Sequence, residues 1–238
     1  MAYALSMTSR TATVFSLALF PDVFLFQRVL SSDVVFTLSD RRLDDKNHAN
    51  ECVLRSASGT RRKIEIPVRT RRVPIDEVDV PEPVTWFPGM QKEVQHIYRG
   101  LLLASAATAL VSQLLPPYTS PWLTDYLMHP FVMTMRWLGW EKEIVRGDHL
   151  QRRRYASDCE YLLDLCLENR CQRLIVGTGP ETKCRELFCK AGLALVSQRW
   201  DGSKDLLGRD SILDAVARFS AADINKSLQA TESATAPI

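Results

Sequence analysis

The sequence predicts an α/β protein with a mixed central sheet, flanking helices and a basic antiparallel β-hairpin. Within residues 13–38, an apolar run ended by a proline, an amphipathic segment and a second apolar run follow one another, which is the pattern of a β-α-β unit. From residue 151 onward, helix-like segments again alternate with short apolar runs at 173–176 and 193–197. A sheet covered by helices accounts for both halves of the chain.

The middle of the chain predicts different elements. Residues 51–69 hold two runs that alternate apolar with polar or charged side chains around Ser58-Gly59, which is typical of a half-exposed hairpin. Prolines and acidic residues across 73–89 indicate an irregular linker. Residues 90–138 predict a helical segment that is interrupted at Pro116-Pro117.

The end of the chain sets the predicted domain boundary. A last helix is expected over 210–219, and the composition beyond it becomes small and polar. Such a segment buries too little apolar surface to fold. We therefore expect one α/β domain over residues 1–220 and a disordered tail over 221–238.

Composition and charge limit the possible functions. The chain has 238 residues and a formal net charge of +2, so its total charge predicts no polyanion partner. Arginines cluster at 61–62, 69–72 and 152–154, which indicates either local phosphate-binding patches or solvated faces. The apolar residues 12–26 are interrupted by Pro21-Asp22, so we interpret them as core rather than as a signal peptide. No run is long enough to span a membrane, and a cytoplasmic location is expected.

The six cysteines contain no CxxC pair, and the sequence shows no metal-ligand spacing and no ATP-binding motif. We expect reduced thiols, no structural zinc, no disulfide framework and no cofactor.

A candidate site lies in the loop that follows the apolar run 33–38. Binding and catalytic groups tend to sit on loops held by a rigid scaffold. The candidates are carboxylates, cations, an imidazole and an amide: Asp33 at the start of the run, and Asp40, Arg41, Arg42, Lys46, His48 and Asn50 after its end. Taken singly, each has an equally good structural explanation as a cap, an ion pair or a surface group. A second candidate is Thr178 in the turn Gly177-Thr-Gly-Pro180, where a helix N-terminus can bind an anion, although a plain turn explains this signal better.

The order of these pieces resembles the WbqC-like family, which occurs in bacterial surface-polysaccharide loci. The resemblance covers roughly residues 13–218 and rests on several short motifs. Departures from the family pattern fall near the presumed site, with His48 in place of an aromatic, Glu51 in place of arginine and Met90 in place of histidine. The matching positions are Pro21, Phe26, Asp33, Asp40, Lys46, His48, Asn50, Glu51, Ser58-Gly59, Ile66-Pro67-Val68, Pro74-Ile-Asp-Glu-Val78, Trp86, Tyr98, Gly177-Thr-Gly-Pro180 and Ser211-Ile-Leu-Asp214.

The resemblance implies an activity. The family is thought to attach amino acids, glycine in particular, to an acceptor. A bacteriophage branch with a similar size and arginine-rich hairpin comprises amino-acid:DNA transferases, which join glycine to phosphorylated 5-hydroxymethyluracil in DNA as the amine displaces phosphate. The expected partners are therefore glycine and double-stranded DNA carrying 5-phosphomethyl-deoxyuridine. The expected location is the cytoplasm, that of the host cell for a phage protein.

That reaction assigns roles to the candidates. A carboxylate or imidazole must deprotonate the amine, and Asp40, His48 and Asp33 are the candidates. Cations must neutralise the departing phosphate, for which Lys46, Arg41 and Arg42 are suited, while Asn50 and Thr178 can bind substrate. Trp86, Phe87 and Trp122 are candidates for stacking a flipped base, with burial in the core the better expectation for Trp122. The residues expected to contact the DNA backbone are Arg61, Arg62, Lys63, Arg69, Arg71 and Arg72.

Two alternatives remain open from sequence. The same reaction can use a nucleotide-linked sugar of a surface polysaccharide, although that acceptor needs no wide basic face. A non-catalytic DNA-binding accessory protein would depend on Arg71 and Arg72 but not on Asp40 or His48. Salt-sensitive binding to ordinary duplex DNA would favour a DNA partner over the sugar.

Overall fold

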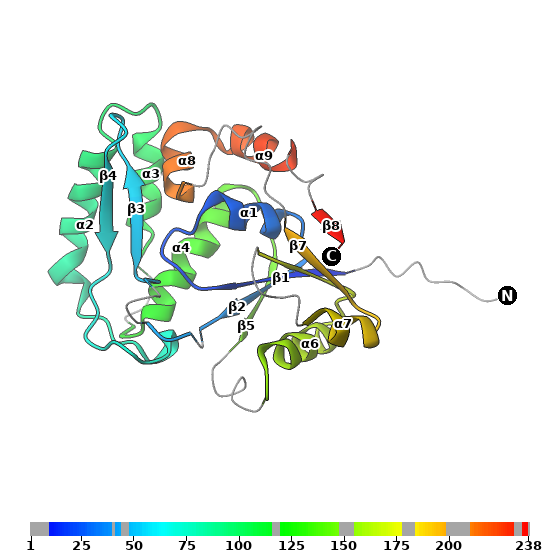
Figure 1. Ribbon diagram of the computed structural model, residues 1–238. Helices are drawn as coiled ribbons and strands as arrows, with labels where there is room; N and C mark the ends of the chain where they lie inside the picture. Colours follow the sequence, from blue (N-terminus) through cyan, green and yellow to red (C-terminus); the bar gives the residue numbers. More distant parts are fainter. Residues whose placement is uncertain are drawn as a thin grey trace.

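The computed structural model describes residues 10–39, 41–43, 48–115, 120–147, 155–177, 184–198, 210–230 and 235–237. Its central sheet has the strand order β5-β2-β1-β6-β7-β8 (Figure 1). The first five strands in this order pair in parallel, and β8 is antiparallel to β7. The strands are β1 Thr11–Ser16, β2 Val34–Leu38, β5 Glu143–Gly147, β6 Arg173–Val176, β7 Ala194–Gln198 and β8 Thr235–Pro237. The predicted α/β class and mixed sheet are confirmed.

The predicted opening unit is present. Strand β1 pairs in parallel with β2, and α1 (Val23–Leu30) connects them. The helix begins where Asp22 accepts a hydrogen bond from the Leu25 N–H at 2.9 Å, which satisfies one of the unpaired amides of the first turn. Its side chains are almost all buried, because α1 lies between the sheet and the helices α8 and α9.

Two apolar clusters lie on opposite faces of the sheet. Side chains alternate along β2, so Val35 belongs to one cluster while Val34 and Phe36 belong to the other. Phe188 of α7 is fully buried in the second cluster. The larger cluster takes in α1, α2 (Pro83–Ile97), α3 (Ala104–Ser112), α4 (Leu123–Trp137), α8 (Ile212–Arg218) and α9 (Ala221–Ala230), and the smaller takes in α6 (Asp158–Glu168) and α7 (Arg185–Lys190).

The hairpin forms a separate two-stranded sheet. Strands β3 (Glu51–Arg55) and β4 (Arg61–Glu65) are antiparallel, as predicted, and stand beyond the carboxyl ends of β1 and β2 (Figure 1). Leu54 and Ile64 are buried, so one face of the hairpin packs onto the protein. Leu54 is paired with Arg62 across the two strands, which places Arg62 on this inner face as well.

Two segments differ from the sequence-based expectation. The chain from 90 to 115 forms parts of two helices rather than one, because Gly100 has a φ of +87°, which ends helical geometry after α2. Helix α2 also begins at Pro83, inside the expected linker. The tail was expected to be disordered, yet Ala221–Ala230 forms α9, and its Ile224 and Leu228 are buried.

The cysteines differ from expectation in one pair. Cys159 at the start of α6 is bonded to Cys184 just before α7, although we expected six reduced thiols. Cys52, Cys166 and Cys171 are buried thiols, as expected, whereas Cys189 is an exposed thiol. None of the helices within the described ranges is long and apolar enough to cross a membrane.

Candidate active site

The carboxyl edge of the parallel sheet is the natural location for a site. The chain passes from β1 to β2 and β5 on one side, then returns to β6 and β7 on the other side of β1. In open α/β sheets, ligands bind outside the carboxyl ends of the strands near such a reversal of strand order. The segments that follow β2 and β6, where the sequence placed its candidates, both leave from this edge.

Four polar side chains, which we call the carboxyl-edge cluster, gather at the ends of β2 and β5. The Ser39 hydroxyl lies 3.2 Å from Asp76 Oδ2 and 3.1 Å from the Gly147 carbonyl oxygen, both of which can accept its proton. The Arg146 guanidinium lies 3.5 Å from Asp125 Oδ1 on α4. Asp76 belongs to the short 3-10 helix η1 (Ile75–Glu77). The members are Ser39, Asp76, Asp125 and Arg146.

Backbone pairing explains how Asp76 reaches β2. The Leu43 N–H donates to the Val73 carbonyl at 3.0 Å, and the Ile75 N–H donates to the Arg41 carbonyl at 3.1 Å. Residues 41–43 therefore run alongside residues 72–75. This pairing holds Arg41 and Arg42, two of the predicted phosphate-binding residues, next to the segment that enters η1.

The neighbouring side chains lie so close to the Gly147 backbone that they leave no room for a side chain there. A Cβ atom there would lie 2.5 Å from the Tyr161 hydroxyl and 3.0 Å from Leu38 Cδ2. The Gly147 carbonyl is also an acceptor for Ser39. The absence of a side chain thus lets β5 end close against the end of β2.

An ion-pair network occupies the base of the hairpin. Lys63 Nζ lies 3.1 Å from Glu51 and 3.3 Å from Glu65, and His48 Nδ1 lies 3.6 Å from Glu51. Hydrogen bonds to Glu51 and then Glu65 raise the pKa of Lys63. The departure from the family pattern at Glu51 therefore supplies a carboxylate that His48 and Lys63 both face.

Asn50 is a structural part of this base. Its side chain is fully buried, and its amide nitrogen donates to the Ile66 carbonyl at 2.8 Å and to Glu65 at 3.2 Å. Glu65 also accepts from Arg71 at 3.0 Å. Asn50 therefore holds Glu65 in position, and the folded hairpin leaves it no solvent-facing surface for a substrate.

Under the β6 turn lies a buried cation. Arg28 of α1 donates to the Gln198 side-chain oxygen at 2.9 Å, and a Cβ atom on Gly177 would lie 2.9 Å from Arg28 Nη1. A side chain at residue 177 would therefore require the Arg28 guanidinium to shift. Thr178, predicted to bind an anion here, lies outside the described residues.

The structure separates the predicted catalytic residues. Asp33 precedes β2 and accepts a hydrogen bond from the Thr11 N–H at 2.8 Å, so it lies at the amino edge of the sheet, away from the cluster. His48 lies at the carboxyl edge, because the neighbouring Ala49 carbonyl accepts from the Leu19 N–H at 2.8 Å. Asp40 and Lys46 lie outside the described residues.

The predicted DNA-contacting residues fall into two groups. Arg61 and Lys63 lie on the outer face of the hairpin, opposite to Arg62. Arg69 and Arg71 follow the hairpin and pair with Asp79 and Glu65. Arg72 has a φ of +65°, and its N–H donates to the Leu43 carbonyl at 2.7 Å. No single basic face carries all six residues.

The aromatic candidates differ in exposure. Phe87 is buried and Trp86 is half-buried, with its indole N–H donating to the Pro81 carbonyl. Trp122 was expected in the core but is 47% exposed. It directly precedes α4, three residues before Asp125, so it is nearer in the chain to the carboxyl-edge cluster than the other two candidates.

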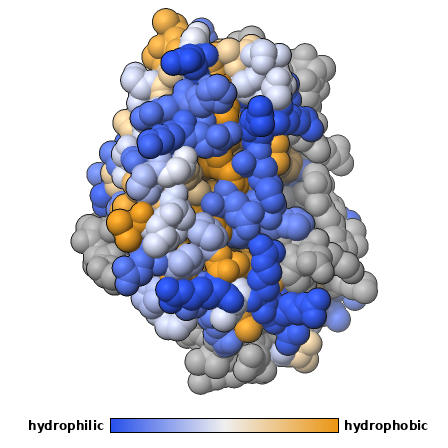
Figure 2. All heavy atoms as spheres, turned by 90° about the vertical axis from the view of Figure 1, so that its left-hand side faces the viewer, coloured by the Kyte–Doolittle hydropathy of each residue, from blue (hydrophilic) through white to orange (hydrophobic). Residues whose placement is uncertain are grey.

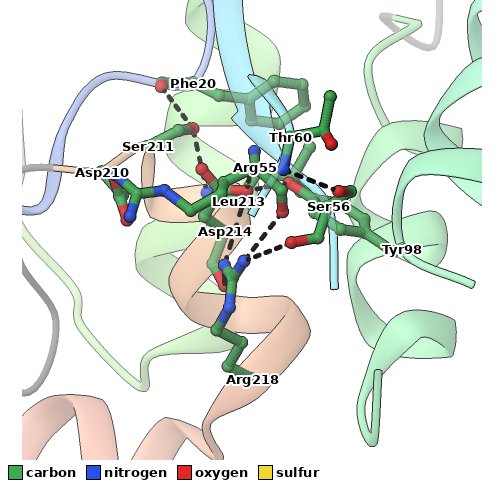
Figure 3. A network of polar contacts seen from close by, with 10 residues as sticks. All are labelled: Phe20, Arg55, Ser56, Thr60, Tyr98, Asp210, Ser211, Leu213, Asp214 and Arg218. Carbon is green, nitrogen blue, oxygen red and sulfur yellow. Dashed lines mark hydrogen bonds and ion pairs between the residues drawn. The ribbon is translucent and has the colours of Figure 1, made fainter. Parts of the chain in front are cut away.

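A buried carboxylate fixes the hairpin to the helices (Figure 3). Asp214 Oδ1 of α8 accepts from the Arg55 N–H at 2.8 Å and from the Tyr98 hydroxyl at 2.9 Å. Arg218 donates to the carbonyls of Asp214 and Arg55. Desolvation raises the pKa of Asp214, against the opposing effect of these partners. We call Arg55, Tyr98, Asp214 and Arg218 the hairpin junction.

A family model described as the WbqC-like protein family matches residues 18–205. The chain belongs to this family. No curated protein and no solved structure matches it.

The family match contains the elements that build the site. It spans β2, the hairpin, η1 and the carboxyl ends of β5, β6 and β7, and it ends before Ser211-Ile-Leu-Asp214, where the hairpin junction has its carboxylate. Sequence reasoning missed Asp76, Asp125 and Arg146. Asp76 belongs to the motif Pro74-Ile-Asp-Glu-Val78, which the sequence does show, whereas no local pattern marks Asp125 or Arg146. Within the described ranges, no three His, Cys, Asp or Glu side chains gather as metal ligands would.

Proposed function

We propose that this protein is an amino-acid transferase that joins glycine to phosphorylated 5-hydroxymethyluracil in DNA. The observation that carries the proposal is the carboxyl-edge cluster, in which the pairs Ser39–Asp76 and Arg146–Asp125 lie at the ends of β2 and β5, and the backbone that holds Arg41 and Arg42 pairs with the segment leading to Asp76. Membership of the WbqC-like family supports the reaction class, and the phage branch that the sequence resembles supplies the acceptor.

The proposed reaction is a displacement at the methylene carbon of the phosphorylated base. The glycine nitrogen forms a bond to this carbon, the carbon–oxygen bond to the phosphate breaks, and inorganic phosphate leaves with the bonding electron pair. The glycine ammonium must first lose a proton to a base. The products are the glycine-substituted base and phosphate, and no further reactant is needed.

The described residues divide these tasks. Asp76, together with Asp40 and His48 from the sequence, is a candidate to accept the amine proton, because Ser39 holds its carboxylate at the end of β2. Arg146 and the loop arginines Arg41 and Arg42 can neutralise the departing phosphate. Asp33 has no role in this proposal, since it lies at the amino edge of the sheet.

Access to the base is assigned to Trp122. A base modified within a duplex must leave the stack, and an aromatic side chain is a common platform for it. Trp122 offers an exposed indole while its backbone is anchored, with its N–H donating to the Ser120 hydroxyl at 3.1 Å and Asp79 bridged to it. Phe87 is unsuited to this role because it is buried.

The test is a transfer assay. Duplex DNA carrying 5-phosphomethyl-deoxyuridine is incubated with protein and glycine, digested to nucleosides and analysed by mass spectrometry for glycine in place of phosphate. We expect product with the wild-type protein and with Glu168→Gln, an exposed carboxylate on α6 away from the site. Asp76→Asn and Asp40→Asn should each lower the yield at least tenfold, within the range that a general base contributes.

Three other outcomes redirect the proposal. Product formation that is unchanged by both substitutions removes these carboxylates from the reaction. No product with salt-sensitive duplex binding retained points to another amino acid or to an accessory DNA-binding protein. No product and no duplex binding favours the sugar acceptor.

A further inference from the structure

A polar groove of about 300 Å³ lies between the hairpin turn and the end of α2. We call it the tip groove. Two of its hydroxyls are hydrogen-bonded to Ser58, at 2.9 Å from Ser56 and 3.1 Å from Thr60. Figure 2 views the side of the molecule that carries α2 and the hairpin, where hydrophilic side chains cover most of the surface. The polar lining residues are Ser56, Ser58, Thr60, Arg62, His96 and Arg99.

Two arginines line this groove without a carboxylate partner among the residues that the structure describes. Arg62 extends from the inner face of β4, and Arg99 follows the last turn of α2, so two separate elements bring cations to one groove. Both arginines are exposed, and neither forms an ion pair with a carboxylate among the described residues. The groove lining contains no acidic residue.

The outer face of the hairpin is different. Lys63 pairs with both Glu51 and Glu65, Arg71 pairs with Glu65, and Arg55 pairs with Asp210. These carboxylates reduce the attraction of the paired cations for a phosphate. Three of the cations near the outer face are thus paired with carboxylates and Arg61 has no such partner among the described residues, whereas the tip groove brings two exposed arginines from separate elements together.

We infer that the tip groove binds a backbone phosphate of the DNA acceptor. This inference rests on the proposed function for the identity of the polyanion. Arginines supply paired N–H donors to phosphate oxygens, and hydroxyls from Ser56 to Thr60 supply further donors. Such contacts position the duplex without reading its sequence.

The hairpin length sets where this contact falls. Glu51 at the base and Ser56 at the turn are five residues apart, which spans about 17 Å at about 3.4 Å per strand residue. Along B-DNA, at about 3.4 Å per base pair, this is about five base pairs. When the modified base lies at the carboxyl edge, the tip groove therefore contacts the same duplex about five base pairs away from that base.

The first test measures binding to unmodified duplex DNA as a function of salt. Each lost phosphate contact lowers the slope of log K against log salt by about 0.9, which corresponds to about eightfold weaker binding at 0.1 M salt. Both arginines are inferred to contact one phosphate, so the double variant Arg62→Gln/Arg99→Gln should bind about eightfold more weakly, with a slope smaller by about 0.9. The charge-matched control Lys190→Gln/Lys226→Gln, on α7 and α9, should bind like the wild type.

A second test uses the predicted footprint. Duplexes carry the phosphorylated base either three or ten base pairs from their nearer end. The wild-type protein should transfer glycine less efficiently to the short-armed duplex, whereas the Arg62→Gln/Arg99→Gln variant should not distinguish the two. Thermal unfolding of the variant within 2 °C of the wild type, as expected for two exposed arginines, confirms that folding is intact.

The outcomes separate this inference from the proposed function. If the groove variant binds duplex DNA with the same salt slope as the wild type, the tip groove does not bind a backbone phosphate, even where glycine transfer proceeds. If the wild-type protein transfers no glycine but the groove variant shows the smaller salt slope, the proposed reaction is wrong and the phosphate contact is supported. A wild-type protein that binds no duplex at all overturns both.

Discussion

Replacing Asp214 with alanine should detach the hairpin from α8 and α2. The carboxylate oxygen Oδ1 is the acceptor for the Arg55 N–H at 2.8 Å and the Tyr98 hydroxyl at 2.9 Å, and Asp214 and Tyr98 are both buried. The substitution leaves two buried donors without an acceptor. Hydrogen bonds to charged groups contribute about 1.5–3 kcal/mol each, so we expect a loss of about 3–6 kcal/mol in the free energy of unfolding.

The measurement is equilibrium unfolding in urea, followed by tryptophan fluorescence and far-UV circular dichroism. For a domain of this size, the expected loss lowers Tm by roughly 6–24 °C. Asp214→Asn keeps an oxygen acceptor for both donors and should lose less than about 1.5 kcal/mol. Tyr98→Phe removes one of the two bonds, and its effect should not add to that of Asp214→Ala. A loss below about 1 kcal/mol in the alanine variant would refute the reasoning.

The same carboxylate gives a pH signature. Burial raises the pKa of Asp214 above its ordinary value, so the folded state binds the proton more tightly than the unfolded state. Its stabilising contribution is therefore complete below the ordinary carboxyl pKa and is lost as pH rises through the folded-state pKa. The wild-type protein should gain stability relative to Asp214→Asn as pH falls from 7 towards 4. An unchanged difference between the two proteins over this range would contradict the assignment.

Three further predictions concern the cysteines and the exposed tryptophan. The Cys159–Cys184 disulfide closes a loop with a sequence separation of 25. Replacing both residues with serine should therefore lower the free energy of unfolding, measured in urea under oxidising conditions, by about 3 kcal/mol. The control Cys189→Ser should change it by less than about 0.5 kcal/mol. Burial raises the pKa of Cys52 to about 12, so iodoacetamide at pH 8 should label Cys189 and leave Cys52 unmodified by peptide mass analysis; equal labelling of both would contradict this. Trp122→Ala should reduce glycine transfer at least tenfold and shift Tm by less than about 4 °C, because the side chain is half exposed; transfer at the wild-type rate would exclude the stacking role.

Local pattern was sufficient for elements whose signal is contained in a few neighbouring residues. The β6 run Arg173–Val176 was predicted with its observed bounds, because a run of four mostly apolar residues that ends in a Gly/Pro turn is too short for a helix and fits a buried strand. The hairpin was predicted from its alternation and Ser58-Gly59, and Gly59 has the positive φ that this turn uses. The bend between α2 and α3 was missed because the long helix-like composition outweighed the single residue Gly100.

The tail and Trp122 show where local pattern fails. Helix α9 has low average apolarity, and it packs against α1 and α8 with Ile224 and Leu228 buried. Trp122 is apolar by type, yet it precedes α4 at a point where the chain runs along the surface. In both cases, the burial of a side chain depends on which elements pack against it, and the local sequence does not reveal those neighbours.

The sequence by itself determined the α/β class, the hairpin, the strand-then-loop placement of the polar residues and, through several short motifs, the WbqC-like family. These properties follow from local periodicity and residue order. The tertiary structure alone decided which charges meet. Asp76 reaches Ser39 through the pairing of residues 41–43 with 72–75, and Asp125 of α4 lies 3.5 Å from Arg146 of β5, a residue 21 positions later in the chain. It also decided that Arg62 faces a groove with Arg99 while Lys63, its neighbour in the chain, is paired with carboxylates, because adjacent strand residues point to opposite faces.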